Sequence, residues 1–254
     1  MKTITSRILF LIGFLIVWET VYKMQFFSPL LFPSIFTIYD SFVKGMVSGD
    51  LLIRTYNSLR LILLGMFIGI VLAFLLASIS VINSFFHGFV ENIIVFLYPI
   101  PGIALFPLTI LWFGIGEGSI LFIILHSVIW SILLNVLSSI RSIPEIYIEV
   151  GLNLELNKIR LVTDIYIPAC VPQIIAGLKI ALGRAWRTAI AAEMVFGVVG
   201  NLAGLGWYMS YARNSLDIAG LLSGLIVIIV IGIFFEDVVF NIIENATVRK
   251  WGMI

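Results

Sequence analysis

The chain has 254 residues, of which 61% are hydrophobic and only 11% are charged. Soluble domains are roughly half apolar and about one-quarter charged, so this composition indicates an integral membrane protein. A formal net charge of +1 argues against a nucleic-acid-binding protein, and the single cysteine, Cys170, excludes an intrachain disulfide and a cysteine-based metal site.

Apolar segments of about 20 residues, the length needed to cross the hydrocarbon core, recur along the chain. The six candidates are Ile8–Tyr22 with its flanks, Leu59–Ile79, Phe89–Phe113, Ile120–Ile140, Val171–Val195 and Ile218–Phe235. The first follows Lys2 and Arg7 as a signal peptide would, but no small-residue cleavage site comes after it, so we expect it to be retained. The sequence therefore predicts an all-α membrane protein with six transmembrane helices in a single domain, residues 1–254.

Basic residues between the spans predict the orientation, because cytoplasmic loops carry more Lys and Arg. Six crossings place both termini on one side, together with Lys2, Arg7, Arg141, Lys158, Arg160, Arg249 and Lys250. The opposite side holds Lys23, Lys44, Arg54, Arg60 and Arg213. This excess predicts cytoplasmic termini and a cytoplasmic loop after the fourth span.

The outward connection after the first span contains Pro29 and Pro33 and continues into Ser34–Val47. Apolar residues recur at helical spacing there, at Ile35, Ile38, Phe42 and Met46. This spacing predicts a short helix at the membrane surface.

The third span contains Pro99, Pro101, Gly102 and Pro107. Prolines inside a helix leave carbonyls unpaired, which a membrane tolerates only where the backbone is buried in protein or lines a cavity. A merely kinked, lipid-facing helix is the alternative, and a broken helix on a transport path is the interpretation we favour. Its candidate pathway residues are Tyr98, Pro99, Pro101 and Phe106.

Between Glu149 and Pro168 the chain reads EVGLNLELNKIRLVTDIYIP, a polar loop in an apolar surrounding. Its charged residues are Glu149, Glu155, Lys158, Arg160 and Asp164. A solvated loop without further role is the simplest interpretation of such a cluster. The spacing and the sequence that follows favour a surface that contacts a partner in water.

The fifth span carries Lys179, Arg184, Arg187 and Glu193. A charge at the bilayer centre costs at least about 2.5–3.5 kcal/mol, so these side chains should face protein or water. Lys179 lies near the cytoplasmic end and is expected to snorkel. Arg184 and Arg187 share one helix face, among small residues typical of a tightly packed helix.

Two interpretations of Arg184 and Arg187 stay open. A guanidinium offers a fixed fork to a sulfonate, carboxylate or other oxyanion, which suits an anionic solute, and Arg187 is the better candidate. The alternative is an internal ion pair with Glu193 or with Glu19 of the first span. The candidate pathway residues of this span are Arg184, Trp186, Arg187, Ala191 and Glu193.

The sequence lacks the motifs of several enzyme and transporter classes. It has no phosphate-binding loop for ATP, no hydrolase or dinucleotide motif, and no visible internal repeat of the kind found in secondary transporters. His126 of the fourth span has no second ligand at metal-binding spacing, so we expect a hydrogen-bonded interior residue and no metal site. An energy source on another subunit is implied.

The loop resembles a motif of the inner-membrane permeases of binding-protein-dependent ABC importers, E-A-A-x3-G-x9-I-x-L-P. Anchored on Pro168, the motif falls on Glu149, Val150, Gly151, Glu155, Ile165 and Ile167. The stretches IPGIALFPLTILWFGIGEGS (Ile100–Ser119) and GLKIALGRAWRTAIAAEM (Gly177–Met194) look like the nitrate/sulfonate/taurine branch of that family. The resemblance runs from about Ser28 to the C-terminus.

One departure concerns the turn of the loop, because Glu155 stands where the family has glycine. Glycine there permits a positive φ, and Asn153 or Asn157 is expected to adopt this conformation instead, since Asn tolerates it better than other residues. A rival register, from Glu145 to Gly151, makes the spacing to Pro168 four residues too long.

The resemblance implies a type I ABC importer permease in the bacterial cytoplasmic membrane. Its implied partners are a second copy of the chain, two cytoplasmic ATP-binding subunits that hold ATP and Mg, and an extracellular or periplasmic solute-binding protein; the chain itself needs no cofactor. Loop 145–168 would form a surface helix docked on the ATPase, through Glu149, Val150, Gly151, Asn153, Glu155, Asn157, Lys158, Arg160 and Pro168. Pro168 would fix the start of the fifth span.

The solute implied by this branch is a small anion such as a sulfonate, taurine, nitrate or bicarbonate, or else a small heterocyclic vitamin precursor. An ATP-independent secondary carrier or channel is the alternative from another class. A membrane-embedded enzyme is a third possibility, but no pair of catalytic residues supports it.

Overall fold

The structure is a computed structural model that describes residues 2–82, 84–197 and 203–250. Every regular element in these ranges is a helix, which confirms the all-α class. Five helices in the described ranges are long and apolar enough to cross a membrane: Thr5–Lys23, Asp50–Ser80, Glu117–Arg141, Ile159–Phe196 and Ile218–Ala246. The bent pair Phe85–Leu97 and Gly102–Phe113 makes a sixth if it counts as one span.

The chain divides into two compact units, each described by itself. The first comprises Met1–Ser58 and Glu193–Val230, and the second comprises Leu59–Ala192 and Ile231–Ile254. Three helices contribute to both units: α3 (Asp50–Ile82), α9 (Ile167–Phe196) and α11 (Ile218–Phe234).

The first unit contains α1 (Lys2–Lys23), α2 (Ile35–Val47) and α10 (Leu205–Asn214) in addition to the ends of shared helices. The Trp18 ring stacks on Phe32 with centroids 4.1 Å apart, and its Nε1 donates to the Pro33 carbonyl at 3.0 Å. Glu19 accepts from the Ile35 backbone N–H at 3.2 Å, at the N-terminus of α2, where a negative charge is favoured. The predicted short helix is thus confirmed, and Glu19 anchors its N-terminus.

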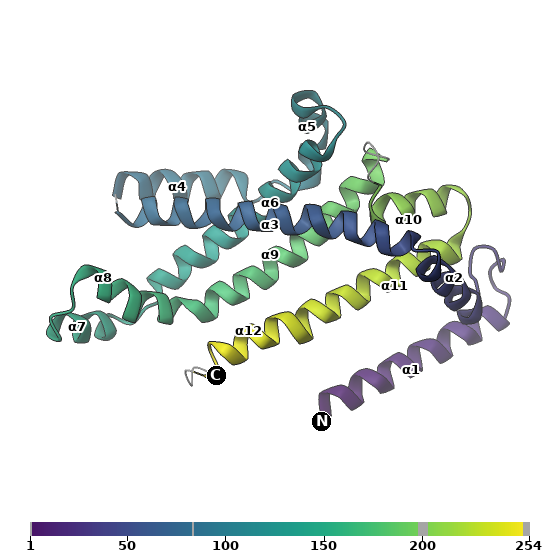
Figure 1. The fold of residues 1–254 in the computed structure, drawn as a ribbon, viewed down its shortest axis with the longest axis horizontal. Helices are drawn as coiled ribbons and strands as arrows, with labels where there is room; N and C mark the ends of the chain where they lie inside the picture. The colour runs from purple at the N-terminus through teal and green to yellow at the C-terminus, as the bar shows by residue number, and fades with distance from the viewer. Residues whose placement is uncertain (1, 83, 198–202, 251–254) are drawn as a thin grey trace. The chain divides into compact units, whose positions relative to one another are not determined.

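The second unit is built around α6 (Glu117–Arg141), whose Ile123, Ile124, Val128 and Leu133 are completely buried. Its other elements are α4 (Ser84–Leu97), the 3₁₀ turn η1 (Gly102–Leu105), α5 (Phe106–Phe113), α7 (Glu145–Asn153), α8 (Lys158–Leu161), the π-helical turns η2 (Val162–Tyr166) and η3 (Phe235–Phe240), and α12 (Asn241–Ala246). In Figure 1, α7 and α8 form a short pair in the connection between α6 and α9.

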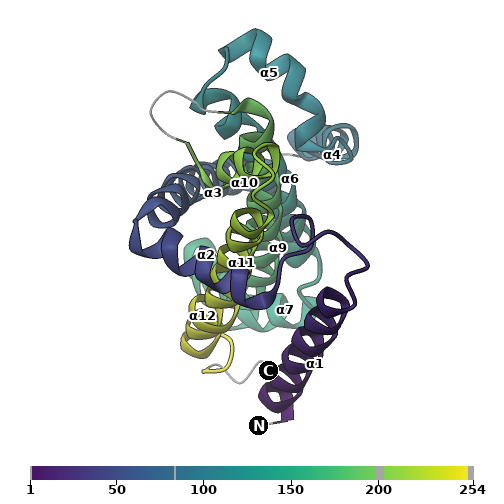
Figure 2. The same ribbon diagram turned by 90° about the vertical axis from the view of Figure 1, so that its right-hand side faces the viewer.

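The third predicted span is broken at its prolines. Its two helical parts meet at an angle of 85°, and Figure 2 shows α4 nearly end-on while α5 runs across the view. The break packs against α6, because a Cβ at Gly102 would overlap the Ser127 hydroxyl and lie 3.0 Å from the Ile123 carbonyl oxygen. The broken helix is therefore confirmed, and a simple kink is not what forms.

The fifth span is helical over a longer range than predicted. Helix α9 begins at Ile167, so Pro168 lies in its first turn, as expected, but helical turns continue upstream of it to Ile159. The Nζ of Lys179 is paired with Glu244 at 2.7 Å and with Glu236 at 3.1 Å. These ion pairs connect α9 to the C-terminal end of the second unit.

Candidate functional site

A cavity of about 420 Å³ lies between the break of the third span, α6 and α9. The bend contributes Tyr98–Ile103 to its wall, α6 contributes His126, Ser127 and Trp130, and α9 contributes Arg184, Arg187, Thr188 and Ala191. All of these residues belong to the second unit. The volume falls within the roughly 300–1,000 Å³ of small-molecule sites.

Six of the nine pathway residues predicted from the sequence line this cavity. They are Tyr98, Pro99, Pro101, Arg184, Arg187 and Ala191. Phe106, Trp186 and Glu193 are not part of the lining. The residues of α6 and Thr188 were missed, although Ser127 and Trp130 are polar residues in an apolar helix and Thr188 is adjacent to Arg187.

Arg184 is held in place by Tyr98. Its Nη2 donates to the Tyr98 hydroxyl at 2.6 Å, and its Cζ lies 4.6 Å from the centre of the same ring. A guanidinium over an aromatic face is stabilised by the ring quadrupole. Arg184 therefore joins α9 to the bend and keeps its charge at the edge of the cavity.

Arg187 is less constrained. Its Nε donates to the Gly183 carbonyl of its own helix at 3.1 Å, and the side chain is exposed. Among the described residues, neither Arg187 nor Arg184 forms an ion pair. Glu193 and Glu19, the partners expected in the alternative, belong to the first unit, where each accepts hydrogen bonds of its own.

The expectation for His126 is wrong in one respect. Neither ring nitrogen has a hydrogen-bond partner among the described residues, although both atoms are buried. The ring instead meets Trp130 edge-on, with centroids 6.0 Å apart. In the described ranges no group of three or more His, Cys, Asp or Glu side chains is placed to hold a metal ion.

Glu193 belongs to a buried network in the first unit. Its carboxylate accepts from the Ser58 hydroxyl at 2.7 Å and from the Gly206 N–H at 2.8 Å, while Ser58 accepts from the Leu205 N–H at 2.8 Å. A Cβ at Gly204 would overlap this carboxylate. Glu193 therefore holds the start of α10 against α3.

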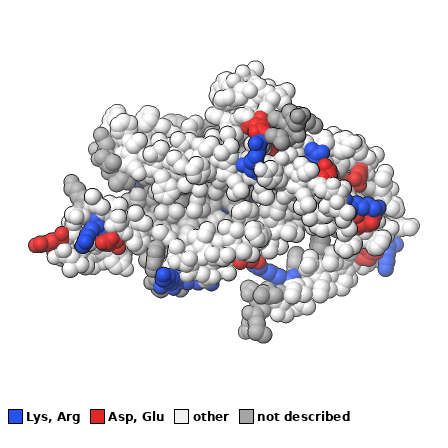
Figure 3. Space-filling model, in the orientation of Figure 1, with Lys and Arg blue, Asp and Glu red and all other residues white. Residues whose placement is uncertain are grey.

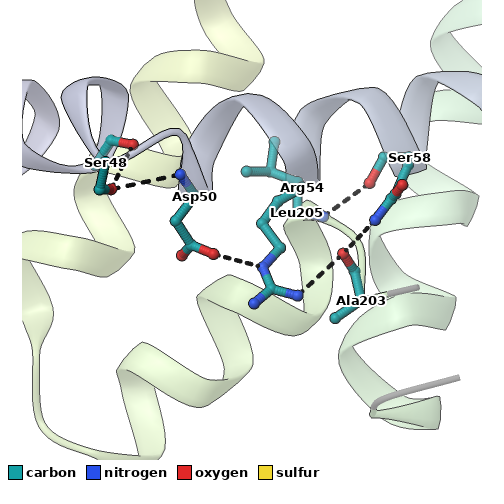
Figure 4. Close-up of polar contacts among 8 residues, drawn as sticks. Ser48, Asp50, Arg54, Ser58, Ala203 and Leu205 are labelled. Atoms are coloured by element: carbon teal, nitrogen blue, oxygen red, sulfur yellow. Dashed lines mark hydrogen bonds and ion pairs between the residues drawn. The ribbon is translucent and has the colours of Figure 1, made fainter. Parts of the chain in front are cut away.

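The same junction is reinforced one turn earlier in α3. Figure 4 shows Arg54 reaching the Ala203 carbonyl, at 3.4 Å, while Ser58 bonds Leu205. Asn57 donates to the same carbonyl at 3.1 Å, and the Arg54 guanidinium lies 4.4 Å from the centre of the Trp207 ring. The network gives the buried Glu193 side chain its hydrogen-bond partners within the first unit.

The predicted docking segment forms the α7–α8 pair. In Figure 3 acidic and basic atoms gather at the end where Figure 1 places these helices. Its exposed charged residues are Glu145, Glu149, Glu155, Arg160 and Asp164. Large apolar side chains are exposed beside them, namely Ile146, Tyr147, Val150, Leu152, Leu154 and Ile159. The side chain of Lys158 lies outside the part that the structure describes.

The turn between α7 and α8 has its positive φ at Glu155, where φ is 53°. The Leu156 N–H donates to the Gly151 carbonyl at 3.1 Å, and the Glu155 N–H donates to the Leu152 carbonyl at 3.0 Å. These two bonds define a Schellman motif, in which the left-handed residue is usually glycine. The expectation that Asn153 or Asn157 adopts this conformation is wrong.

Asn157 and Gly151 have other structural roles in the loop. The Asn157 side chain accepts from the Arg160 N–H at 2.9 Å and caps α8. Gly151 is buried, and a Cβ there would overlap the end of Ile165 and lie 2.7 Å from the end of Leu161. The rival register, which places Gly151 at the turn, does not match this geometry.

Residues 65–249 match the family described as "Binding-protein-dependent transport system inner membrane component". The chain is similar to the taurine transport system permease protein TauC of Escherichia coli strain K12, with 27% identity over 240 residues, 92% of this chain and 86% of that protein. It is also similar to the putative aliphatic sulfonates transport permease protein SsuC of Bacillus subtilis strain 168, with 25% identity over 216 residues, 85% and 77% of the two chains. The nitrate import permease protein NrtB of Synechocystis sp. is 30% identical over 199 residues, 77% of this chain and 70% of that protein.

Proposed function

Because the chain belongs to the family of binding-protein-dependent transport system inner membrane components, we propose that its cavity conducts a small anionic solute inward. The chain is a multi-pass membrane permease of an ABC importer, with five or six candidate spans in its described residues. Family membership implies ATP-binding subunits and a solute-binding protein as partners.

The charge of the cavity wall carries the proposal of an anionic solute. Arg184 and Arg187 line it, and its described wall includes no Asp or Glu. Guanidiniums without a counterion favour a negatively charged ligand. The related permeases named for taurine, aliphatic sulfonates and nitrate support the same class, since each of these solutes carries an anionic group.

We infer that the α7–α8 pair docks on an ATP-binding subunit and moves the cavity wall through α9. The helical run Ile159–Phe196 begins in the docking segment and carries Arg184 and Arg187. The exposed apolar residues of the docking segment, such as Val150 and Leu154, suit insertion into a cleft of a partner. A displacement of the pair would reach the cavity along one helix, without an intervening hinge.

The assembly proposed is a pair of permease chains with two ATP-binding subunits, which bind ATP and Mg, and one external solute-binding protein. The second permease chain is proposed to be a copy of this one, with cytoplasmic termini. Co-purification of two differently tagged copies of this chain tests the pairing. Recovery of a different permease in place of the second copy would contradict it.

Import into proteoliposomes tests the proposed solute class. The purified complex, supplied with its binding protein and with ATP on the cytoplasmic side, should accumulate an organic sulfonate or nitrate only when ATP is hydrolysed. Arg187→Gln should lower import at least about tenfold, as expected for loss of a charged hydrogen bond of roughly 1.5–3 kcal/mol. Arg213→Gln, at an exposed arginine outside the cavity lining, is the matched control. Uptake without ATP, or import by Arg187→Gln at the wild-type rate, would refute the proposal.

The docking role has its own test. Replacing Glu149 and Lys158 by alanine should abolish solute-stimulated ATP hydrolysis while the assembled membrane chains stay folded. Thr163→Ala, on the same segment and with only local hydrogen bonds, is the control. Unchanged stimulation in the double variant would remove these residues from the coupling surface.

A further inference from the structure

The guanidiniums of Arg184 and Arg187 line the cavity beside the broken span. In the described ranges the only hydrogen bond of Arg187 is the one from Nε to Gly183, so Nη1 and Nη2 have no partner. The buried ring nitrogens of His126 and Trp130 in the same wall have no partner either. A guanidinium donates and does not accept, so the two Nη atoms of Arg187 require acceptor atoms from outside the described wall.

The hydroxyl groups of the wall are bonded to other protein groups. The Tyr98 hydroxyl accepts from Arg184 at 2.6 Å, and the Ser127 and Thr188 hydroxyls bond each other at 3.1 Å. The described wall contains no carboxylate. A cationic group in this cavity would therefore lack a counterion and would lie beside two guanidiniums.

The remaining wall is apolar and belongs to the bend. Pro99, Ile100, Pro101 and Ile103 line the cavity there, and the backbone break exposes their side chains to it. A volume of about 420 Å³ exceeds what a head group of one central atom and three oxygens fills. The space and its lining suit an organic tail attached to that head group.

We propose that this cavity selects an organic anion with one charged head group and an apolar tail, and that it rejects the zwitterion of the same size. The proposal rests on the import of an anionic solute proposed above and narrows its class. Arg187 binds the head group, Arg184 stays beside it through its hydrogen bond to Tyr98, and the tail contacts the proline-rich bend. An ammonium two carbons from the head group would be repelled by both arginines.

Ethanesulfonate and taurine provide a direct test, because they differ only in the ammonium group. Binding is measured by isothermal titration on the complex with its ATP-binding subunits in nanodiscs, without the solute-binding protein. Ethanesulfonate should bind at least about tenfold more tightly than taurine. Nitrate, which has no tail, should also bind more weakly than ethanesulfonate. Arg187→Gln should abolish the preference, and Arg213→Gln should retain it.

An added carboxylate should move the selectivity toward the zwitterion. Ala191→Asp places an acceptor in the cavity wall and should shift the ratio of the two affinities at least about tenfold in favour of taurine. Asn92→Asp adds the same charge in a separate groove of α4 and α6 and should leave the ratio unchanged. Should Ala191→Asp fail to assemble, the wild-type comparison decides by itself.

Two outcomes would overturn the proposal. Taurine or nitrate binding as tightly as ethanesulfonate would show that the wall does not discriminate. Absence of any binding, in a preparation that still imports an anion when ATP and the binding protein are added, would show that selection lies elsewhere. The proposed function would fail in a different way, by loss of ATP-driven import of every anion tested.

Discussion

Replacing Glu155 by glycine is expected to stabilise the turn between α7 and α8. Glu155 is held at a φ of 53° by the two bonds that close α7. The left-handed backbone conformation costs an L-residue roughly 1–2 kcal/mol of conformational free energy, whereas glycine adopts it freely. The greater freedom of glycine in the unfolded chain offsets about 0.5–1 kcal/mol of this gain. The net stabilisation of about 0.5–1 kcal/mol lowers the equilibrium constant for opening of the turn about two- to fivefold.

Hydrogen exchange of the α7 amides in the nanodisc complex measures this equilibrium. Glu155→Gly should slow the exchange about two- to fivefold, by the free energy derived from the left-handed conformation. Glu155→Ala is the matched control, because the Glu155 side chain is exposed and alanine keeps the backbone penalty. If alanine protects α7 as well as glycine does, the effect belongs to the side chain and the reasoning from φ is refuted. Faster exchange in the glycine variant would refute it as well.

Three further substitutions test other parts of the structure. Ser58→Ala removes a hydrogen-bond partner from the buried Glu193 carboxyl and from the buried Leu205 N–H, at a cost of about 1–3 kcal/mol for each group. It should therefore lower the melting temperature more than Ser78→Ala, whose exposed hydroxyl bonds only a carbonyl of its own helix. Equal melting temperatures of the two variants would contradict the network. Gly151→Val overpacks the contact of α7 with the following turns by about 1–3 kcal/mol and should speed amide exchange there, whereas Gly151→Ala should have a smaller effect, since the side-chain ends that it meets can shift. Tyr98→Phe keeps the ring beneath the Arg184 guanidinium but removes the hydroxyl bonded to it, and it should reduce anion import several-fold; an unchanged rate would show that this bond does not position the arginine.

The broken third span was predictable because its cause is local. Three prolines within nine residues cannot all continue a helix, whatever surrounds them. The restriction on exposed backbone in a membrane then places the break against protein or a cavity. The 85° bend and the contact of Gly102 with α6 agree with this reasoning.

The wall contributed by α6 was not predictable in the same way. Helix α6 is apolar almost throughout, so its hydrophobic pattern does not mark which side faces the cavity. Ser127 and Trp130 face it because the bend and α9 pack on that side. The partners of Lys179 were missed for a related reason, since Glu236 and Glu244 lie more than 50 residues away in sequence.

The turn between α7 and α8 shows how a family pattern and local propensity can disagree. Propensity alone favours Asn over Glu at a positive φ, and on that basis Asn153 or Asn157 was expected at the turn. The hydrogen bonds that end α7 assign the position instead, because a Schellman motif requires its left-handed residue directly after the C-cap, which is Leu154. Glu155 therefore adopts the conformation of the glycine that it replaces, and Asn157 is left free to cap α8.

The helical run from Ile159 through Pro168 determines how a displacement of the α7–α8 pair would reach the cavity. A non-helical segment before Pro168 would leave a flexible joint between the two. The π-helical turn η2 instead precedes Pro168 and joins α8 to α9, and wider turns of this kind are a known way to fit a proline into a membrane helix. A rigid connection displaces Arg184 and Arg187 together, whereas Tyr98 stands on the separate segment of the bend. Motion of α9 must therefore either carry the bend along or break the bond between Arg184 and Tyr98. A disulfide that fixes α9 to the bend would distinguish the two, because only the second path requires the bond to open during transport.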